Sequence, residues 1–143
     1  MKKRSSQDVR GFNRWYTNVI GLLNRHLLDS AYSLAEARLI YEIHAAGSIR
    51  ASQIMANMQI DKSYLSRLLK KLEMQKVVAT QPAPEDGRAI LLRLTEKGVR
   101  EFAALNNASD QQIGRLLLPL SEAARLELVG HMKAIMHLLT TTK

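Results

Sequence analysis

Basic and hydroxyl side chains gather close together near the middle of the chain, at Lys62, Ser63, Tyr64, Ser66, Arg67 and Lys70. An arginine guanidinium can donate two parallel hydrogen bonds to a guanine edge, and serine hydroxyls can donate to or accept from base edges. Lysine ammonium groups, including that of the neighbouring Lys71, suit phosphates. These residue types predict a surface that contacts nucleic acid. The alternative is an ordinary amphipathic helix whose solvated face is basic.

A second candidate is Arg88, which follows Asp86 in a turn-rich segment. An arginine carried on a hairpin can enter the minor groove of DNA, where negative potential is concentrated, and Asp86 could hold its guanidinium in one orientation. Because Asp-Gly pairs are common in ordinary turns, this pattern indicates a DNA contact only together with the neighbouring motifs.

Two short helices around a tight turn are predicted to position the first group. The first contains Ile54, Met55 and Met58, and the second runs from Lys62 to about Lys76 with Asp61 as its N-cap. The inner face of the second helix carries Leu65, Leu68, Leu69 and Leu72. This pattern is a helix-turn-helix, whose second helix enters the major groove with its N-terminal residues against the bases.

A β-hairpin is predicted next, with strands at residues 77–80 and 89–94 and a tip at 82–87. Before the helix-turn-helix, Ser33 and Glu36 form a capping box that begins a helix near Leu34, and Gly47 ends this helix after Ala46. Residues 48–50 are expected to be an extended link. The predicted fold class is mainly α, a winged helix-turn-helix with a two-stranded wing.

Long helices are predicted at both ends of the chain. They cover residues 8–28, 95–118 and 122–139, with Pro119 closing the second and Ser121 capping the third. Their apolar faces are wider than a single neighbour would cover. The sequence therefore predicts a single domain over residues 1–143, in which about 33–98 form the winged-helix region.

Composition narrows the classes of function. The chain has 143 residues, 21 Lys and Arg, 13 Asp and Glu, and a net charge of +8. Counting along the sequence, 16 basic and 9 acidic residues (+7) lie in residues 1–98, against 5 and 4 (+1) in residues 99–143. This excess favours a polyanion as partner.

Several chemistries are excluded or not expected. The absence of cysteine excludes disulfides, thiolate zinc sites, iron–sulfur clusters and thiol redox sensing. No apolar run reaches the roughly 20 residues of a membrane span, so we expect a soluble cytoplasmic protein with no membrane partner. Neither a nucleophile elbow nor a phosphate-cradling loop appears, so no enzyme, cofactor or metal site is predicted. Packing is the expected role of the histidines, His26, His44, His131 and His137.

Taken in order, these motifs resemble the MarR family of bacterial winged-helix regulators. The residues that look like its recognition helix, wing and exit signature are Asp61-Lys62-Ser63-Tyr64-Leu65-Ser66-Arg67, Leu72-Glu73, Pro84-Glu85-Asp86-Gly87-Arg88 and Leu94-Thr95-Glu96-Lys97-Gly98. Segments that look most like a subgroup often fused to a GNAT-type acetyltransferase are Val9 to Tyr16, Leu34 to Arg38 and Tyr64 to Arg67. No acetyltransferase segment is present, so a standalone regulator or an excised domain is expected.

The resemblance implies a homodimer whose helices 8–28 and 99–140 intertwine. It also implies a repressor that binds a pseudo-palindromic operator in double-stranded DNA and is released by a small molecule. From the two-fold geometry of such dimers, half-site centres are expected about one helical turn apart. A cleft between the dimer helices and the winged region is implied as the ligand site. Candidates to hold a small aromatic or phenolic anion there are Phe12, Arg14, Trp15, Tyr16, Arg38 and Tyr41, with Arg14 or Arg38 as counter-ion. Core and dimer packing is the alternative role of these aromatic rings.

Three positions depart from the family pattern. Gln59 and Lys76 stand where the family often has glycine, and each could strain a backbone position of positive φ. Arg50 stands where a Ser or Thr cap is usual, so the start of the short helix is less defined. Other functions stay open, namely a non-specific architectural DNA binder, a winged module that docks on protein, or the regulatory half of an acetyltransferase system.

Overall fold

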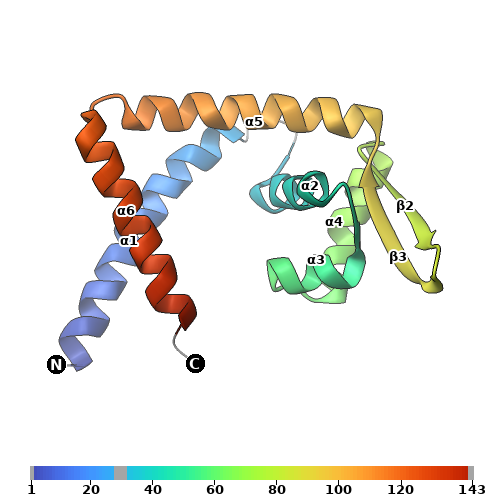
Figure 1. The fold of residues 1–143 in the computed structure, drawn as a ribbon, viewed down its shortest axis with the longest axis horizontal. Helices are drawn as coiled ribbons and strands as arrows, with labels where there is room; N and C mark the ends of the chain where they lie inside the picture. The colour runs from blue at the N-terminus through green and yellow to red at the C-terminus, as the bar shows by residue number, and fades with distance from the viewer. Residues whose placement is uncertain (1, 28–31, 142–143) are drawn as a thin grey trace. The chain divides into compact units, whose positions relative to one another are not determined.

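The computed structural model of the chain describes residues 2–27 and 32–141. Its elements, shown in Figure 1, are α1 (Lys2–Leu27), α2 (Leu34–Ala46), β1 (Ser48–Arg50), α3 (Ala51–Met58), α4 (Lys62–Met74), β2 (Val78–Ala83), β3 (Asp86–Leu94), α5 (Glu96–Leu117) and α6 (Glu122–Thr141). They divide into two compact units, one up to Ser109 and one from Asp110 onward, with the boundary inside α5. Within the described ranges, no helix is both long and apolar enough to cross a membrane.

The predicted boundaries of α2 are confirmed. The Ser33 hydroxyl accepts the Glu36 N–H at 3.2 Å, and the Glu36 Oε1 accepts the Ser33 N–H at 2.8 Å. This reciprocal pair satisfies two of the donors that a helix N-terminus leaves free. At the other end Gly47 adopts φ 81°, where a side chain would be strained, and stops the helix.

The core of the first unit lies where α2, α3, α4 and the sheet meet. Its fully buried side chains are Leu39, Ile40, Ile43, Ile54, Leu72, Val77 and Leu92. All four leucines predicted for the inner face of α4 are buried in this cluster. Because burial of each large aliphatic side chain stabilises the fold by about 1.5–3 kcal/mol, this shared core fixes α4 by its apolar face and leaves its polar face to solvent.

The sheet has one strand more than the hairpin predicted from sequence. Its order is β1-β3-β2, and β1 pairs antiparallel with β3 through Ser48 and Arg93, Ile49 and Leu92, and Arg50 and Leu91. The expected extended link is therefore a third strand. A segment of this length has too few positions to show strand periodicity, and its partner lies far along the chain, so local patterns did not reveal it.

The wing strands are longer than predicted, and the loop at 82–87 is correspondingly shorter. β2 extends through Pro82 to Ala83, and β3 begins at Asp86, with a register irregularity between Pro82 and Ala83. Pro82 is compatible with a strand here because β2 is an edge strand of the sheet. A proline whose nitrogen faces outward removes no ladder hydrogen bond.

Contacts at the corner after α4 account for the residue types in the segment from Leu94 to Gly98. The Thr95 hydroxyl donates to the Lys76 carbonyl at 2.6 Å, and the Thr95 N–H donates to the Val77 carbonyl at 3.0 Å. In turn, the Thr95 hydroxyl accepts the Gly98 N–H at 3.0 Å and caps α5. A Cβ on Gly98 would overlap the Val77 carbonyl oxygen, so this position requires glycine.

Both expected positive-φ positions are confirmed, with Gln59 at φ 54° and Lys76 at φ 61°. They bracket α4, one in the turn before it and one just after it. The helix itself ends at Met74, two residues before the predicted end, because the chain turns into the left-handed region at Lys76.

The remaining helices agree with prediction in kind and differ in extent. α1 begins at Lys2 rather than near residue 8, since no glycine or proline interrupts its first turns. α5 continues unbroken through the polar stretch 106–110, whose mostly exposed side chains fit a solvated helix face. The Ser121 hydroxyl accepts the Ala124 N–H at 3.1 Å, as expected of the cap of α6.

Candidate DNA-binding site

The first turn of α4 is fixed by its N-cap. The Asp61 Oδ1 accepts the Tyr64 N–H at 2.8 Å. Opposite the buried leucines, the structure places the whole predicted group on the exposed side of the helix, namely Lys62, Ser63, Tyr64, Ser66, Arg67 and Lys70. Two ammonium groups, three hydroxyls and a guanidinium thus share one solvent-facing surface, the arrangement that phosphate and base contacts need.

Arg67 has a partner within this surface. Its guanidinium carbon lies 5.6 Å from the centroid of the Tyr64 ring. A cation over an aromatic face is attracted by the ring quadrupole, with a strength of about 0.5–1 kcal/mol at an exposed site. Tyr64 therefore restricts the Arg67 side chain without using any of its N–H donors, which stay available to a guanine edge.

At the wing, the predicted pairing of Asp86 with the Arg88 guanidinium is not what the structure contains. The Asp86 Oδ1 instead accepts the backbone N–H of Arg88 at 3.0 Å. An aspartate that bonds a backbone N–H two residues further on is a common turn device. Asp86 thus shapes the turn, and the exposed Arg88 side chain is oriented by its backbone position.

A contact that sequence reasoning missed ties the wing turn to the helix-turn-helix. Arg50, the N-cap position of α3, makes no side-chain cap bond, as its residue type led us to expect. Its guanidinium instead lies 3.2 Å from the Glu85 carboxylate. Hydrogen bonding to the backbone of Glu85 itself, together with the Arg50 guanidinium, lowers the pKa of Glu85. These residues lie 35 positions apart, so no local pattern signals the pair.

Lys71, which was expected to suit phosphate, is paired inside the protein. Its ammonium lies 2.9 Å from Glu36 Oε2. Burial opposes ionisation of Glu36, but the Ser33 N–H and the Lys71 ammonium outweigh it, and the pKa of Glu36 is lowered. Helix α4 is thereby linked to the first turn of α2.

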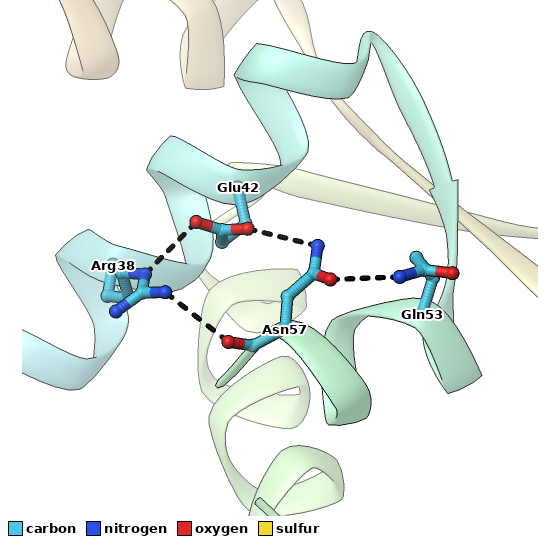
Figure 2. A network of polar contacts seen from close by, with 4 residues as sticks. All are labelled: Arg38, Glu42, Gln53 and Asn57. Carbon is cyan, nitrogen blue, oxygen red and sulfur yellow. Dashed lines mark hydrogen bonds and ion pairs between the residues drawn. The ribbon is translucent and has the colours of Figure 1, made fainter. Parts of the chain in front are cut away.

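A polar network joins α2 to α3, the first helix of the helix-turn-helix (Figure 2). Arg38 Nε donates to Glu42 at 3.0 Å, and the Asn57 amide donates to the same carboxylate at 3.1 Å. Arg38 also donates to the Asn57 carbonyl at 3.4 Å, and Gln53 donates to Asn57 Oδ1 at 2.8 Å. Arg38 was a candidate counter-ion for a ligand, and here its guanidinium is engaged by Glu42.

The candidate ligand residues are placed as follows. Along α1, the Phe12 and Tyr16 rings stack with centroids 5.4 Å apart, and Trp15 lies 6.3 Å from each. Arg14 is exposed on the same helix, and Tyr41 is exposed on α2. In the unit from Asp110 onward, an open hollow of about 420 Å³ is lined by none of these residues but by Gln111, Gly114, Arg115 and Leu118.

His44 was expected to be a partly buried packing residue. Its ring stacks on Phe102 with centroids 3.8 Å apart, which is a packing contact. The side chain nevertheless remains exposed, so burial was overestimated.

Known proteins share the arrangement of the helix-turn-helix and the wing. Residues 32–90, which span α2 to the wing, match the sequence profile of the MarR family. Over its helix-turn-helix and wing, the chain is therefore similar to the MarR family. The HTH-type transcriptional repressor IacR of Pseudomonas putida is 24% identical over 133 residues, covering 93% of this chain and 77% of that protein.

Solved MarR-family structures share the fold. A MarR variant from E. coli in complex with operator DNA aligns with a TM-score of 0.75 and 22% identity, covering 90% of this chain and 95% of that one. PcaV of Streptomyces coelicolor, solved with its natural ligand, aligns with a TM-score of 0.76 and 18% identity, covering 92% of each chain. The two curated relatives are named as a transcriptional repressor and a transcriptional regulator, the class of function that the exposed face of α4 supports.

Proposed function

We propose that this chain is a sequence-specific repressor that binds a pseudo-palindromic operator as a homodimer. The observation that carries the proposal is the exposed face of α4. Its capped N-terminal half presents Lys62, Ser63 and Arg67 to solvent on a helix whose opposite face is buried in the core. A rigid helix of this kind holds side chains in register with base edges. Arg88 on the wing adds a contact to the adjacent minor groove.

Homodimerisation is supported by apolar side chains that the described chain leaves in solvent. On α1 these include Trp15, which is 62% exposed, and on α6 they are Leu126, Val129, Met132, Ile135, Met136, Leu138 and Leu139. An apolar surface of this extent on a chain of ordinary composition marks an interface. A second copy is the proposed occupant, which places two copies of α4 about one helical turn of DNA apart.

Release by a small molecule is the second part of the proposal. The name of IacR supports repression, and the ligand-bound structure of PcaV supports a ligand site in this fold. For this chain we propose a small aromatic or phenolic anion, held by the rings of Phe12, Trp15 and Tyr16 together with Tyr41. Because Arg38 is already paired with Glu42, Arg14 is the better counter-ion. A panel of phenolic acids should raise the melting temperature and weaken DNA binding, and a panel that does neither refutes this part.

The test of the main proposal is competition binding. Purified protein is bound to the DNA upstream of its own coding region and competed with random duplex at two salt concentrations. Retention of the upstream fragment by a factor of about a thousand over random DNA is expected of a specific regulator. Equal loss of both fragments as salt rises would instead indicate a non-specific architectural binder. Absence of binding to either would point to a protein-docking module or the regulatory half of an acetyltransferase system.

Arg88→Ala tests the wing in the same assay. It should weaken operator binding with little change in the melting temperature, because Arg88 is exposed and its backbone N–H bond to Asp86 survives the substitution. Arg93→Ala, an exposed arginine on the same strand, is the matched control for loss of charge. Equal effects of the two variants would remove the minor-groove assignment.

A further inference from the structure

Glu36 is a buried acid whose oxygens are both occupied. Only 4% of the residue is exposed. Its Oε1 accepts the Ser33 N–H at 2.8 Å, and its Oε2 lies 2.9 Å from the Lys71 ammonium. The capping box alone needs only the first of these contacts. The second reaches across to α4, so Glu36 does more than begin its own helix.

The pair restricts what Lys71 can do. If its ammonium left to contact a phosphate, Glu36 would remain as a buried carboxylate without its counter-charge. Leaving a buried carboxylate without its counter-charge is unfavourable. The Lys71 side chain is half-exposed, yet its ammonium lies 2.9 Å from an acid that is itself buried.

Lys70 provides the contrast within the same helix. It is exposed and forms no ion pair with any other described residue. Consecutive residues of an α-helix point about 100° apart, so adjacent lysines face different surroundings. One lysine therefore faces solvent, on the side of Arg67, while the other faces α2.

A further contact extends the link to α5. Tyr32 is buried, and its phenol hydrogen-bonds to Glu101. Burial raises the pKa of Tyr32, and the negative charges of Glu101 and Glu36 raise it further. Tyr32 directly precedes the capping box, so the segment that holds Glu36 is itself attached to the long helix.

We infer that Glu36 is a positioning residue for DNA binding, which sets the seating of α4 on α2 through Lys71, and that Lys71 is not a phosphate contact. This inference rests on the DNA-binding function proposed above. The Glu36–Lys71 pair fixes the orientation of α4, and discrimination between DNA sequences depends on that orientation. The phosphate contact of this helical turn is made by Lys70 instead.

The test compares Lys71→Met and Glu36→Gln with Lys70→Met as the matched control. Each variant is titrated with random duplex and with the selected upstream fragment at several salt concentrations. Lys70→Met should make the slope of log K against log salt less steep by about 0.9, the value of one phosphate contact, with an unchanged preference for the upstream fragment. Lys71→Met should leave the slope unchanged and lower that preference about tenfold.

The double variant that combines Glu36→Gln with Lys71→Met tests whether Glu36 acts through Lys71 or independently of it. If Glu36 acts through Lys71, the loss of preference in the double variant equals that of either single variant, and Lys71→Arg restores it by renewing the ion pair. A Lys71→Met slope that falls as far as that of Lys70→Met, or losses that add, would overturn the inference. The slope comparison on random duplex needs no operator, so it remains decisive even if the wild-type chain shows no preference. Circular dichroism checks that each variant is folded, and Lys71→Gln serves in place of any Lys71→Met protein that is not.

Discussion

Gly98→Ala should unfold the chain at markedly lower urea concentration, because the added methyl group meets a carbonyl that cannot withdraw. The Val77 oxygen it would overlap already accepts the Thr95 N–H at 3.0 Å and the Thr95 hydroxyl at 3.2 Å. Relieving the overlap moves α5 away from the corner after α4. Overpacking of this kind costs about 1–3 kcal/mol. Two weakened hydrogen bonds cost about 1 kcal/mol each.

The same substitution also has a favourable part. Alanine is better than glycine inside a helix by about 1 kcal/mol, so the net loss in the free energy of unfolding is about 2–4 kcal/mol. Gly114→Ala is the matched control, because it lies in the same helix and nothing stands within 4 Å of its added Cβ. It should stabilise the chain by about 1 kcal/mol. Both are measured by urea unfolding at one fixed protein concentration, because the stability of the proposed dimer would depend on concentration. Equal midpoints for the two variants would refute the close approach at Gly98.

Three further outcomes are expected. Arg67→Ala should cost about 1–3 kcal/mol in operator binding and relax the preference at one base position, measured by competition with single-base variants of the site; unchanged affinity and preference would exclude a base contact. Gln59→Gly should raise the urea midpoint, because relief of the left-handed strain, about 1–2 kcal/mol, exceeds the extra backbone entropy of glycine, about 0.5–1 kcal/mol; a lower midpoint would contradict this. The folded-state pKa of Glu36 is lowered, so its stabilisation is present above the unfolded value of 4.5 and is lost as pH falls below it. Unfolding midpoints measured from pH 6 down to about 2 should therefore fall less steeply for Glu36→Gln than for the wild type, and parallel curves would argue against the ion pair.

Local chemistry was sufficient to predict much of the fold. The capping box of Ser33 and Glu36, the N-cap Asp61 and the leucines of α4 each act within one or two helical turns, where sequence spacing and spatial distance are the same. The exposure of Arg67 followed from the same helical period. For these features, sequence spacing alone was sufficient to predict the contacts and the exposure that the structure has.

The contacts that orient the site were not predictable in this way. Arg50 with Glu85, and Lys71 with Glu36, join residues 35 positions apart, and many other charged residues were available to each. Similarly, β1 became visible only through its pairing with β3. Asp86 illustrates a smaller error, since its type and spacing fitted a guanidinium contact as well as the backbone contact it makes. Choice among equivalent partners is decided by packing, which spacing alone does not encode.

The edges of the three-stranded sheet bear on how this protein behaves when crowded. An unpaired strand edge is a template for pairing with another chain, and natural proteins protect such edges. Here one edge strand has only three residues, and the other combines Pro82 with a register irregularity at Ala83. Neither offers a continuous row of backbone donors and acceptors. At high local concentration along a chromosome, the wings of neighbouring molecules are thus kept from joining into intermolecular sheets, and the hairpin remains free for DNA.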